Sequence, residues 1–514
     1  MSARILHGRE LARGDRSESC DVVVCGGGAG GSMAARELAR AGLEVVLLEE
    51  GGDHEPADFT QREDEMIPEL FQDLGGRRTE DLAILVLSGR GLGGSTIHNT
   101  NLCKRIAPEI LARWRDEHGL RGLTDAALAP LFAEVEALLS VTQIPQQRVN
   151  AANAIMQRGI ERLGFRGGRL SHNRDERCIG SGFCELGCAY DGKLNARRLL
   201  IPQAVAAGAT VYTDAHVDRF RVERGELRDV RATLTDGRGN PRGTLSVRAK
   251  AICLAGSAIG SAALALRSDL HDPHAQLGRG LRIHPGAAVV GVFDERVDAW
   301  RGIPQSIECT ELLDLRPGSD KRVWIVPSFA HPVGAAALVP GFGPSLFREM
   351  RRYSHLVALA AMVHDETEGR VTLDDGRVRI AYQPNEADRA QLALGARGAA
   401  RILMAAGARE VMIPAMPAIT IRSERDLDQL LPSRFAPHDA KLTAVHPMGT
   451  LRMGTDPATS VVDERGRHHT LRSLYVVDGS LFPTSIGGPP QIGIYSFALK
   501  VARAVIDDLG ARPG

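Results

Sequence analysis

The sequence lacks several features that mark special classes of protein. Aromatic residues make up 4% of the chain and basic residues equal acidic residues in number, so neither a stacking surface nor a basic face for nucleic acid is indicated. No apolar run is long enough to cross a bilayer, and residues 1–19 lack the apolar core of a secretory signal. We therefore expect a cytoplasmic protein without nucleic acid or a membrane span.

Cysteine is also scarce for the length of the chain. Eight cysteines in 514 residues do not form a disulfide scaffold, and a reducing compartment is the simpler interpretation. The length gives a soft expectation of about three domains. Residues 1–19 are polar, rich in arginine and without periodicity, so they are predicted to form a loose N-terminal arm.

The most informative pattern covers residues 21–52. A β-branched run, a glycine cluster, an amphipathic helical pattern and a second β-branched run follow one another, as in a βαβ unit. Gly26, Gly28 and Gly31 have the spacing that allows a tight turn, close approach of a pyrophosphate and packing of a helix on a strand. The positive end of the helix starting near Gly30 would then face the phosphates.

Glu49 closes the second strand about 20 residues after the glycine fingerprint. A carboxylate there accepts hydrogen bonds from both ribose hydroxyls and repels a 2′-phosphate, which disfavours NADP. The fingerprint follows a strand, opens a helix and meets an acid, so we predict dinucleotide binding. This unit alone does not separate FAD from NAD.

A second glycine-rich stretch, residues 88–105, makes that distinction. Its glycines are too dense for a stable helix or an ordinary strand, and they suit a backbone that passes close to a flat ligand. The stretch resembles the first signature of the glucose–methanol–choline (GMC) family of FAD oxidoreductases, with Thr96 as a conservative departure. The matching residues are Gly89, Arg90, Leu92, Gly93, Gly94, Ser95 and Asn99. The resemblance implies FAD as the cofactor.

The resemblance also implies an α/β fold with a discontinuous, Rossmann-like FAD-binding domain. That domain would comprise residues 20–287, with a helical excursion at 106–175 and a cysteine-rich loop at 178–188, and would be completed by residues 411–514. A substrate-binding domain of antiparallel sheet and helices would occupy residues 288–410.

Motifs near the C-terminus extend the resemblance over most of the chain and carry the chemistry. Oxidation of an alcohol by flavin removes the hydroxyl proton while hydride passes to N5, so a base must lie within hydrogen-bond reach of the hydroxyl. His446 matches the family's catalytic histidine; the alternative is a histidine that only caps a loop. The family usually has asparagine or histidine at the position of Pro489, which offers no donor. Gln491 or a residue of the substrate sheet is the candidate replacement.

The remaining cofactor residues are implied by the same resemblance. Asp478 and Gly479 match residues that bind the flavin, and a helix opened by Pro490 would turn its positive end toward flavin N1 and O2. Together with the motifs above, the expected cofactor-binding set is Gly26, Gly28, Ala29, Gly30, Gly31, Glu49, Arg90, Gly93, Gly94, Ser95, His98, Asn99, Thr100, Asn101, Val217, Gly256, Asp478, Gly479, Pro490 and Gln491.

Two features leave alternatives open. His98 stands where some family members bond a histidine to the flavin 8α-methyl, and otherwise it packs on the ring. Cys178, Cys184 and Cys188 could hold an iron–sulfur cluster, with Ser181 where a further cysteine occurs in relatives. Packed thiols are the favoured interpretation, and no metal site is predicted.

These observations give one main hypothesis and two alternatives. The main one is an FAD-dependent enzyme that oxidises a small-molecule alcohol to a carbonyl and passes electrons to oxygen, a quinone or a carrier protein. The second is a non-redox lyase of the hydroxynitrile-lyase type on the same scaffold. The third is a flavin electron-transfer subunit without substrate chemistry of its own.

Overall fold

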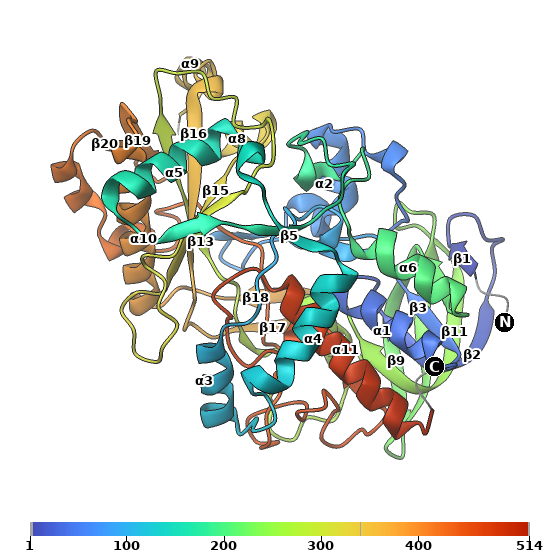
Figure 1. Ribbon diagram of the computed structural model, residues 1–514. Coiled ribbons are helices and arrows are strands. Elements are labelled where there is room, and N and C mark those ends of the chain that lie inside the picture. The colour runs from blue at the N-terminus through green and yellow to red at the C-terminus, as the bar shows by residue number, and fades with distance from the viewer. Residues whose placement is uncertain (1–3, 340, 512–514) are drawn as a thin grey trace.

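The structure is a computed structural model that describes residues 4–339 and 341–511. It is built on two large sheets, each covered by helices (Figure 1). The first sheet has eight strands in the order β1-β8-β3-β2-β11-β10-β9, with β22 also paired to β11. Its parallel pairs join β1 (Arg4–His7), β2 (Arg16–Cys25), β3 (Val45–Leu48), β8 (Thr210–Thr213), β11 (Pro241–Leu254) and β22 (Leu474–Val476). Strands β9 (Ala215–Glu223) and β10 (Glu226–Thr235) form an antiparallel meander with β11.

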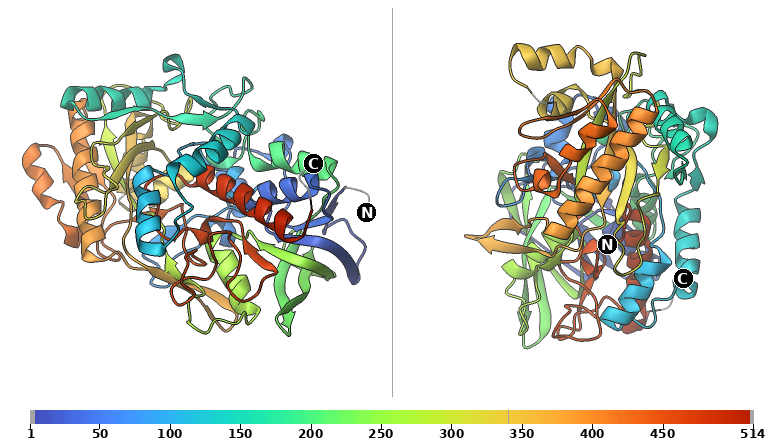
Figure 2. Two further views of the ribbon diagram at one scale, coloured as in Figure 1. Left: turned by 60° about the horizontal axis from the view of Figure 1, so that its bottom comes forward. Right: turned by 90° about the vertical axis from the view of Figure 1, so that its left-hand side faces the viewer.

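Three helices pack together beside the parallel strands (Figures 1 and 2). They are α1 (Ala29–Arg40), α6 (Ala196–Ala206) and α11 (Gln491–Asp508). Helix α1 is rich in small residues, and a Cβ on Gly30 would lie 1.9 Å from the carbonyl oxygen of Val477. The helix therefore packs directly on the backbone that leaves β22. Helix α7 (Ser257–Arg267) follows β11 and contacts β9.

The N-terminal segment differs from the expected loose arm. From Arg4 to His7 it forms β1, which pairs in parallel with the edge strand β8. The Arg9 guanidinium donates two hydrogen bonds of 2.7 Å to the buried carboxylate of Asp214. The prediction was wrong because an open sheet edge supplies backbone partners that a local polar pattern does not reveal. Residues 1–3 of the expected arm lie outside the described residues.

The second sheet has nine strands and lies beside the first (Figure 1). Its main path is β20-β19-β13-β16-β15-β14-β6, and β21 joins β13 to β4. The strands are β4 (Ile84–Val86), β6 (Gly167–Arg169), β13 (Gly286–Val292), β14 (Ile307–Cys309), β15 (Val323–Ser328), β16 (Leu356–Val363), β19 (Glu410–Ile413), β20 (Ile419–Ile421) and β21 (Leu442–Ala444). Helix α10 (Glu386–Ala405) packs on this sheet and on α5 (Ala151–Leu163) (Figure 2, right).

This sheet does not keep to the expected boundaries of the substrate domain. Strand β13 pairs with β16, with β19 and with β21, so the sheet continues well past residue 410. Strands β4 and β6 come from the part of the chain before residue 288. The boundary was misplaced because strand pairing between distant segments is not visible in local periodicity.

The other elements connect these two layers. Two small sheets consist of β12 (Arg279–Leu281), β17 (Gly369–Asp374) and β18 (Arg377–Ala381), and of β5 (Val141–Gln143) and β7 (Ser171–Asn173). The remaining α-helices are α2 (Glu63–Leu70), α3 (Pro108–His118), α4 (Asp125–Leu138), α8 (Pro332–Leu338) and α9 (Pro344–Met350). Within the described ranges, no helix combines the length and apolar character needed to span a bilayer.

Candidate active site

A cavity of about 400 Å³ lies between the two large sheets. From the first sheet it is lined by the end of β2, by the start of α1 and by His216 and Val217 of β9. From the second sheet it is lined by Trp324 and Met362 and by His446, which follows β21. The cavity therefore joins the dinucleotide unit to the motif that carries the candidate base.

Backbone rather than side chains borders the cavity where the two glycine-rich segments meet. A Cβ on Gly94 would lie 2.7 Å from the Cα of Gly28, so the segments approach too closely for any side chain. Gly94 also has a φ of +53°, which favours glycine. Gly28 precedes α1, whose first turn carries no acidic residue and no side-chain cap. Ala29 and Gly30 line the cavity, so the positive end of α1 is open to a phosphate.

A second helix also begins at the cavity. Pro490 precedes α11, whose start at Gln491 has no side-chain cap. Asp478 lines the cavity nearby, and its carboxylate accepts hydrogen bonds from Ser261 Oγ at 2.5 Å and from the Ser480 N–H at 2.9 Å. Burial raises the pKa of Asp478. This arrangement fixes the loop after β22 against α1 and α7.

His446 is paired with another histidine. Its Nδ1 lies 3.0 Å from Nδ1 of His284, so one of the two nitrogens donates a hydrogen bond to the other. His284 is fully buried and has a φ of +55°. Its N–H and that of Ile283 both donate to the buried carboxylate of Asp365, at 3.3 and 2.9 Å. The backbone of the partner histidine is thus held from behind.

Burial and this pairing together set the protonation state of the candidate base. Burial, and then the nearby His284, hold the pKa of His446 well below its usual range. The imidazole is therefore neutral at neutral pH and can accept a proton. With Nδ1 engaged by His284, Nε2 is the nitrogen that remains for a substrate.

Comparison with known proteins identifies this arrangement. The family model described as GMC oxidoreductase matches residues 20–286 in its N-terminal part and residues 365–498 in its C-terminal part. The chain belongs to the GMC oxidoreductase family. FAD is therefore its cofactor. The uncapped start of α1, the close approach of the two glycine-rich segments and the cavity between the two sheets are consistent with FAD binding.

Individual relatives agree with this assignment. An uncharacterised GMC-type oxidoreductase of Mycobacterium tuberculosis is 34% identical over 488 residues, which cover 94% of this chain and 75% of that protein. A long-chain-alcohol oxidase of Arabidopsis thaliana is 26% identical over 95% of this chain and 68% of its own length. The crystal structure of pyridoxine 4-oxidase from Mesorbium loti has a TM-score of 0.70 at 20% identity and covers 94% of this chain and 99% of that one, which shows the same fold.

Most of the residues expected to bind FAD line the cavity of this GMC oxidoreductase. They are Gly26, Gly28, Ala29, Gly30, Glu49, Gly94, Ser95, His98, Asn99, Thr100, Val217, Gly256, Asp478, Gly479, Pro490 and Gln491. Four others do not line it. Gly31 packs on the carbonyl oxygen of Gly26, Gly93 packs on Ile97 and Arg197, Arg90 reaches the Glu50 carbonyl at 3.5 Å, and Asn101 borders a separate small pocket beside the cysteine-rich loop.

Glu49 accepts more hydrogen bonds from the protein backbone than its predicted role in binding ribose requires. Its carboxylate accepts hydrogen bonds from the N–H groups of Gly27 at 2.8 Å, Gly51 at 2.9 Å and Gly91 at 3.1 Å. Burial, followed by the neighbouring charge of Glu50, raises the pKa of Glu49 to about 7. Its carboxylate therefore ties together the two glycine-rich segments, and its remaining lone-pair position is what it can offer a ribose hydroxyl.

Glu50 is a second carboxylate at the same side of the cavity that the sequence patterns did not single out. It lies 3.0 Å from Nδ1 of His216 and also accepts a hydrogen bond from Gln72. Burial acts to raise its pKa, but His216, Gln72 and Arg90 lower it to about 2. Glu50 is therefore charged at neutral pH.

Gln491 does not have a free amide for a substrate. Its Nε2 donates to the Leu102 carbonyl oxygen at 2.6 Å and to Asn173 Oδ1 at 3.2 Å, and its Oε1 accepts from Asn99 at 3.1 Å. The amide thus fastens the second glycine-rich segment to the start of α11. These partners come from distant parts of the chain, so the sequence near Gln491 does not reveal them.

His98 retains an unused nitrogen. The residue lines the cavity, and its ring packs against Phe71 with 4.0 Å between the centroids. Its buried Nε2 has no hydrogen-bond partner among the residues described. Burial, followed by the charge of Lys193, lowers the pKa of His98 to about 3, so the ring is neutral.

The cysteine-rich loop packs beside this segment. Cys178, Cys184 and Cys188 are only partly buried and form no disulfide within the described chain. No cluster of three or more histidine, cysteine or acidic residues suited to a metal occurs among the described residues. The buried Lys193 ammonium donates to the carbonyl oxygens of Ile97, Asn99 and Cys184 at 2.7, 2.5 and 2.8 Å. It thereby joins the loop to the backbone on either side of His98.

Several cavity residues were not found from sequence. They carry no motif, and the side that a strand presents to a cavity depends on pairing that sequence periodicity does not give. They include Phe71, Glu185, Gln305, Trp324, Ser328 and Met362. His284 was also not found from sequence, and its contact with His446 gives it a role.

Proposed function

We propose that this GMC oxidoreductase oxidises an alcohol to a carbonyl, with His446 as the base. The observation that carries the proposal is the 3.0 Å contact between Nδ1 of His446 and Nδ1 of His284. It holds the ring through one nitrogen and leaves Nε2 of a neutral imidazole for the cavity. Bound FAD supplies the hydride acceptor.

The protein's own part in the reaction is to orient the alcohol and to remove its proton. Nε2 of His446 accepts the hydroxyl proton as the carbon–hydrogen bond is broken. The uncapped start of α11 at Gln491 presents backbone N–H groups and the positive end of the helix dipole to the cavity, where they stabilise negative charge.

A second donor for the substrate oxygen comes from the substrate sheet in this proposal. Pro489 lines the cavity without a donor, and the amide of Gln491 is occupied. Ser328 at the end of β15 and Thr443 of β21 also line the cavity, and neither side chain engages another described residue in a hydrogen bond. Their hydroxyls are the proposed partners of His446.

The same wall of the cavity indicates the class of alcohol. Leu102, Trp324, Met362 and Val445 give it a largely apolar surface, so we propose a substrate with an apolar portion beside the hydroxyl. A relative named as a long-chain-alcohol oxidase supports an alcohol as the donor. The electron acceptor is oxygen, a quinone or a carrier protein, and an acceptor panel distinguishes them.

Anaerobic mixing of the holoprotein with a panel of alcohols tests the proposal. Loss of the oxidised flavin absorbance with formation of the carbonyl is the expected result, and a His446→Ala variant should lose it while keeping its FAD. Turnover with an unchanged flavin spectrum would instead indicate a lyase. If the flavin is reduced only by an added redox protein, the chain is an electron-transfer subunit.

Acid precipitation of the same holoprotein tests the covalent bond at His98. The partnerless Nε2 beside Phe71 supports a bond to the flavin, because a buried nitrogen otherwise loses hydrogen-bonding energy. Yellow colour in the pellet would establish the bond, and colour in the supernatant would assign His98 to packing.

A further inference from the structure

A third histidine lies behind the pair formed by His446 and His284. Strand β13 pairs with β16 so that Gly286 is opposite Met362, and the Val363 N–H donates to the Pro285 carbonyl oxygen at 2.9 Å. His284 lies two residues before β13 and His364 directly follows β16, so both residues lie at the same end of this strand pair. Both side chains are buried, at 0% and 2% exposure.

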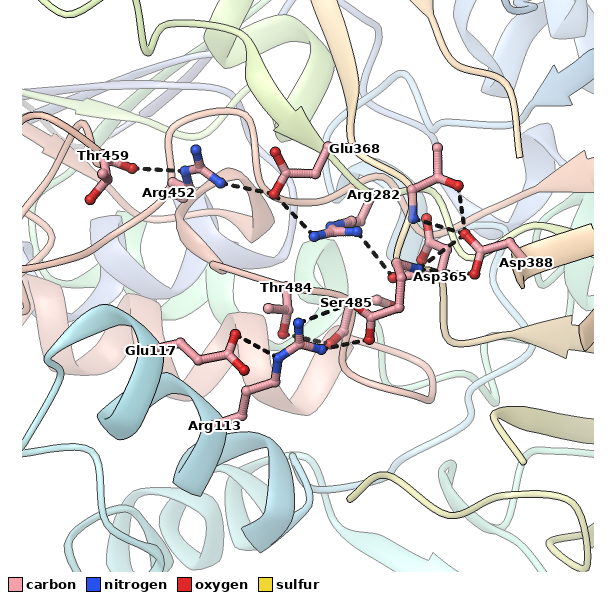
Figure 3. A network of polar contacts seen from close by, with 12 residues as sticks. Arg113, Glu117, Arg282, Asp365, Glu368, Asp388, Arg452, Thr459, Thr484 and Ser485 are labelled. Atoms are coloured by element: carbon pink, nitrogen blue, oxygen red, sulfur yellow. Dashed lines mark hydrogen bonds and ion pairs between the residues drawn. The ribbon is translucent and has the colours of Figure 1, made fainter. Parts of the chain in front are cut away.

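The two buried histidines each have an unused ring nitrogen. Nε2 of His284 and Nδ1 of His364 have no hydrogen-bond partner in the described chain, and the same is true of the buried Ser485 Oγ. Ser485 follows Thr484, which accepts a 2.7 Å hydrogen bond from Trp114 of α3, and Figure 3 draws Ser485 in the same view as the polar network of Arg113 and Asp365. A buried water supplies a hydrogen-bond partner to atoms of this kind.

From His364 the polar contacts continue to the surface. Its Nε2 lies 3.9 Å from Oε1 of Glu366. The Glu366 carboxylate accepts two hydrogen bonds from Arg113, at 2.6 and 3.0 Å, and Arg113 also pairs with Glu117 at 2.9 Å. The Glu117 side chain is 46% exposed, so the network reaches solvent on α3 (Figure 3).

The surroundings keep the third histidine neutral. Burial, and then the charges of His284, Arg113, Arg322 and Arg282, hold the pKa of His364 well below its usual range. A neutral imidazole has one donor and one acceptor nitrogen, so it can accept a proton at one while releasing a proton from the other. A chain of such rings passes a proton on without storing charge at any one ring.

We propose that His446, His284 and His364 form a proton exit that ends at Glu366, completed by a buried water between His284 Nε2 and His364 Nδ1. The inference rests on the proposed function, because it begins with the proton that His446 takes from an alcohol. It assigns a role to His364 and Glu366, which do not touch the substrate.

Each transfer in the exit moves one proton and no electrons. A proton arrives at Nε2 of His446, and the Nδ1 proton of that ring passes to Nδ1 of His284. The Nε2 proton of His284 passes to the water, and the water gives a proton to Nδ1 of His364. The Nε2 proton of His364 then passes to Glu366, once the 3.9 Å separation has closed to hydrogen-bond distance, and from there to solvent. The chain of rings returns to its starting state when each imidazole returns to its original tautomer.

Stopped-flow mixing with an alcohol and a pH indicator dye tests the exit. In the parent holoprotein, proton release should follow flavin reduction closely. A His364→Phe variant should keep its FAD and delay proton release at least tenfold relative to the parent, and added imidazole should restore part of the rate in a His364→Gly variant. A purely structural His364 would give neither the delay nor the rescue. His274→Asn changes an exposed histidine that takes part in none of these contacts, and it is the matched control.

A second measurement does not depend on finding a substrate. A high-resolution crystal structure of the holoprotein should show a water within hydrogen-bond distance of His284 Nε2 and His364 Nδ1. A dry contact or a separation too wide for one water would overturn the exit even if alcohols are oxidised. If no alcohol reduces the flavin but the water is present, the proposed function fails while the buried site stands.

Discussion

Gly30 offers a direct test of how α1 is placed against the cofactor cavity. A Cβ at this position would lie 1.9 Å from the carbonyl oxygen of Val477 and 2.9 Å from its carbon. Both atoms belong to the backbone that leaves β22, so no side chain can turn away. Restoring an ordinary contact of 3.4 Å in Gly30→Ala requires α1 to move by about 1.5 Å. This shift carries the start of the helix, where we expect the FAD phosphates, away from Asp478.

The size of the effect follows from the cost of overpacking. Inserting a methyl group into a closed contact costs typically about 1–3 kcal/mol. If the shift falls on the FAD site, the dissociation constant for FAD rises by roughly 5–150-fold, because each 1.4 kcal/mol is a factor of ten. Titration of the apoprotein with FAD, followed by quenching of flavin fluorescence, measures this change. Thermal unfolding of the apoprotein measures any loss of folding stability that does not affect FAD binding.

Gly168→Ala is the matched control for this experiment. Gly168 lies in β6, away from the cavity lining, and a Cβ there meets no atom within 4 Å. The same chemical change should therefore leave FAD affinity unaltered and stability equal or slightly higher, because alanine loses less backbone entropy than glycine. If Gly30→Ala binds FAD as tightly as the parent and unfolds at the same temperature, the packing of α1 on Val477 does not set the site.

Three further predictions concern the base and its supports. Lys193→Met should lower the free energy of unfolding by about 2–4 kcal/mol and weaken FAD binding, because three buried carbonyl oxygens lose a charged donor. The control Lys250→Met, at an exposed lysine, should change the free energy of unfolding by less than about 0.5 kcal/mol. Equal denaturation midpoints for the two variants would contradict the prediction. The rate of flavin reduction should stay constant as the pH falls to 6.5 and decline only at lower pH. The base acts in its neutral form, and the pKa of His446 is well below 6.5. A pH–rate profile with its decline centred at 6.5 would refute this prediction. Asp365→Asn should slow flavin reduction roughly tenfold, because an amide cannot accept hydrogen bonds from both of the backbone N–H groups that the carboxylate holds. Tyr382→Phe removes only the 2.8 Å hydrogen bond from the tyrosine hydroxyl to Asp365 and should slow flavin reduction less. Equal single-turnover rates for the two variants and the parent would show that the reaction does not need Asp365 to hold His284.

The cofactor half of the site could be predicted because its information is local. The spacing of Gly26, Gly28 and Gly31 between a strand and a helix sets a turn whose geometry depends on residues a few positions apart. The structure starts α1 at Ala29, one residue from the expected start. The α/β class and the two-sheet organisation followed from the same kind of local pattern together with the resemblance to the family.

The base and its surroundings could be predicted only in part. His446 was recognised from its motif, but nothing in the sequence near His284 indicates that the two rings meet, because 162 residues separate them. His364 and Asp365 directly follow β16, and their relation to His284 depends on the pairing of β13 with β16. The sequence gives the strands, but their register is set by packing of the whole sheet.

Pro489 ties these observations together. This residue has no side-chain donor to place beside the base, and Gln491 does not supply one because its amide fastens Asn99 and Leu102 to α11. Freeing that amide would leave buried polar groups unpaired, which costs more than one substrate contact returns. In the proposed function the second donor comes from the other wall of the cavity. Thr443 lies on β21 and His446 follows that strand by two residues, so one short segment would supply both groups that hold the alcohol.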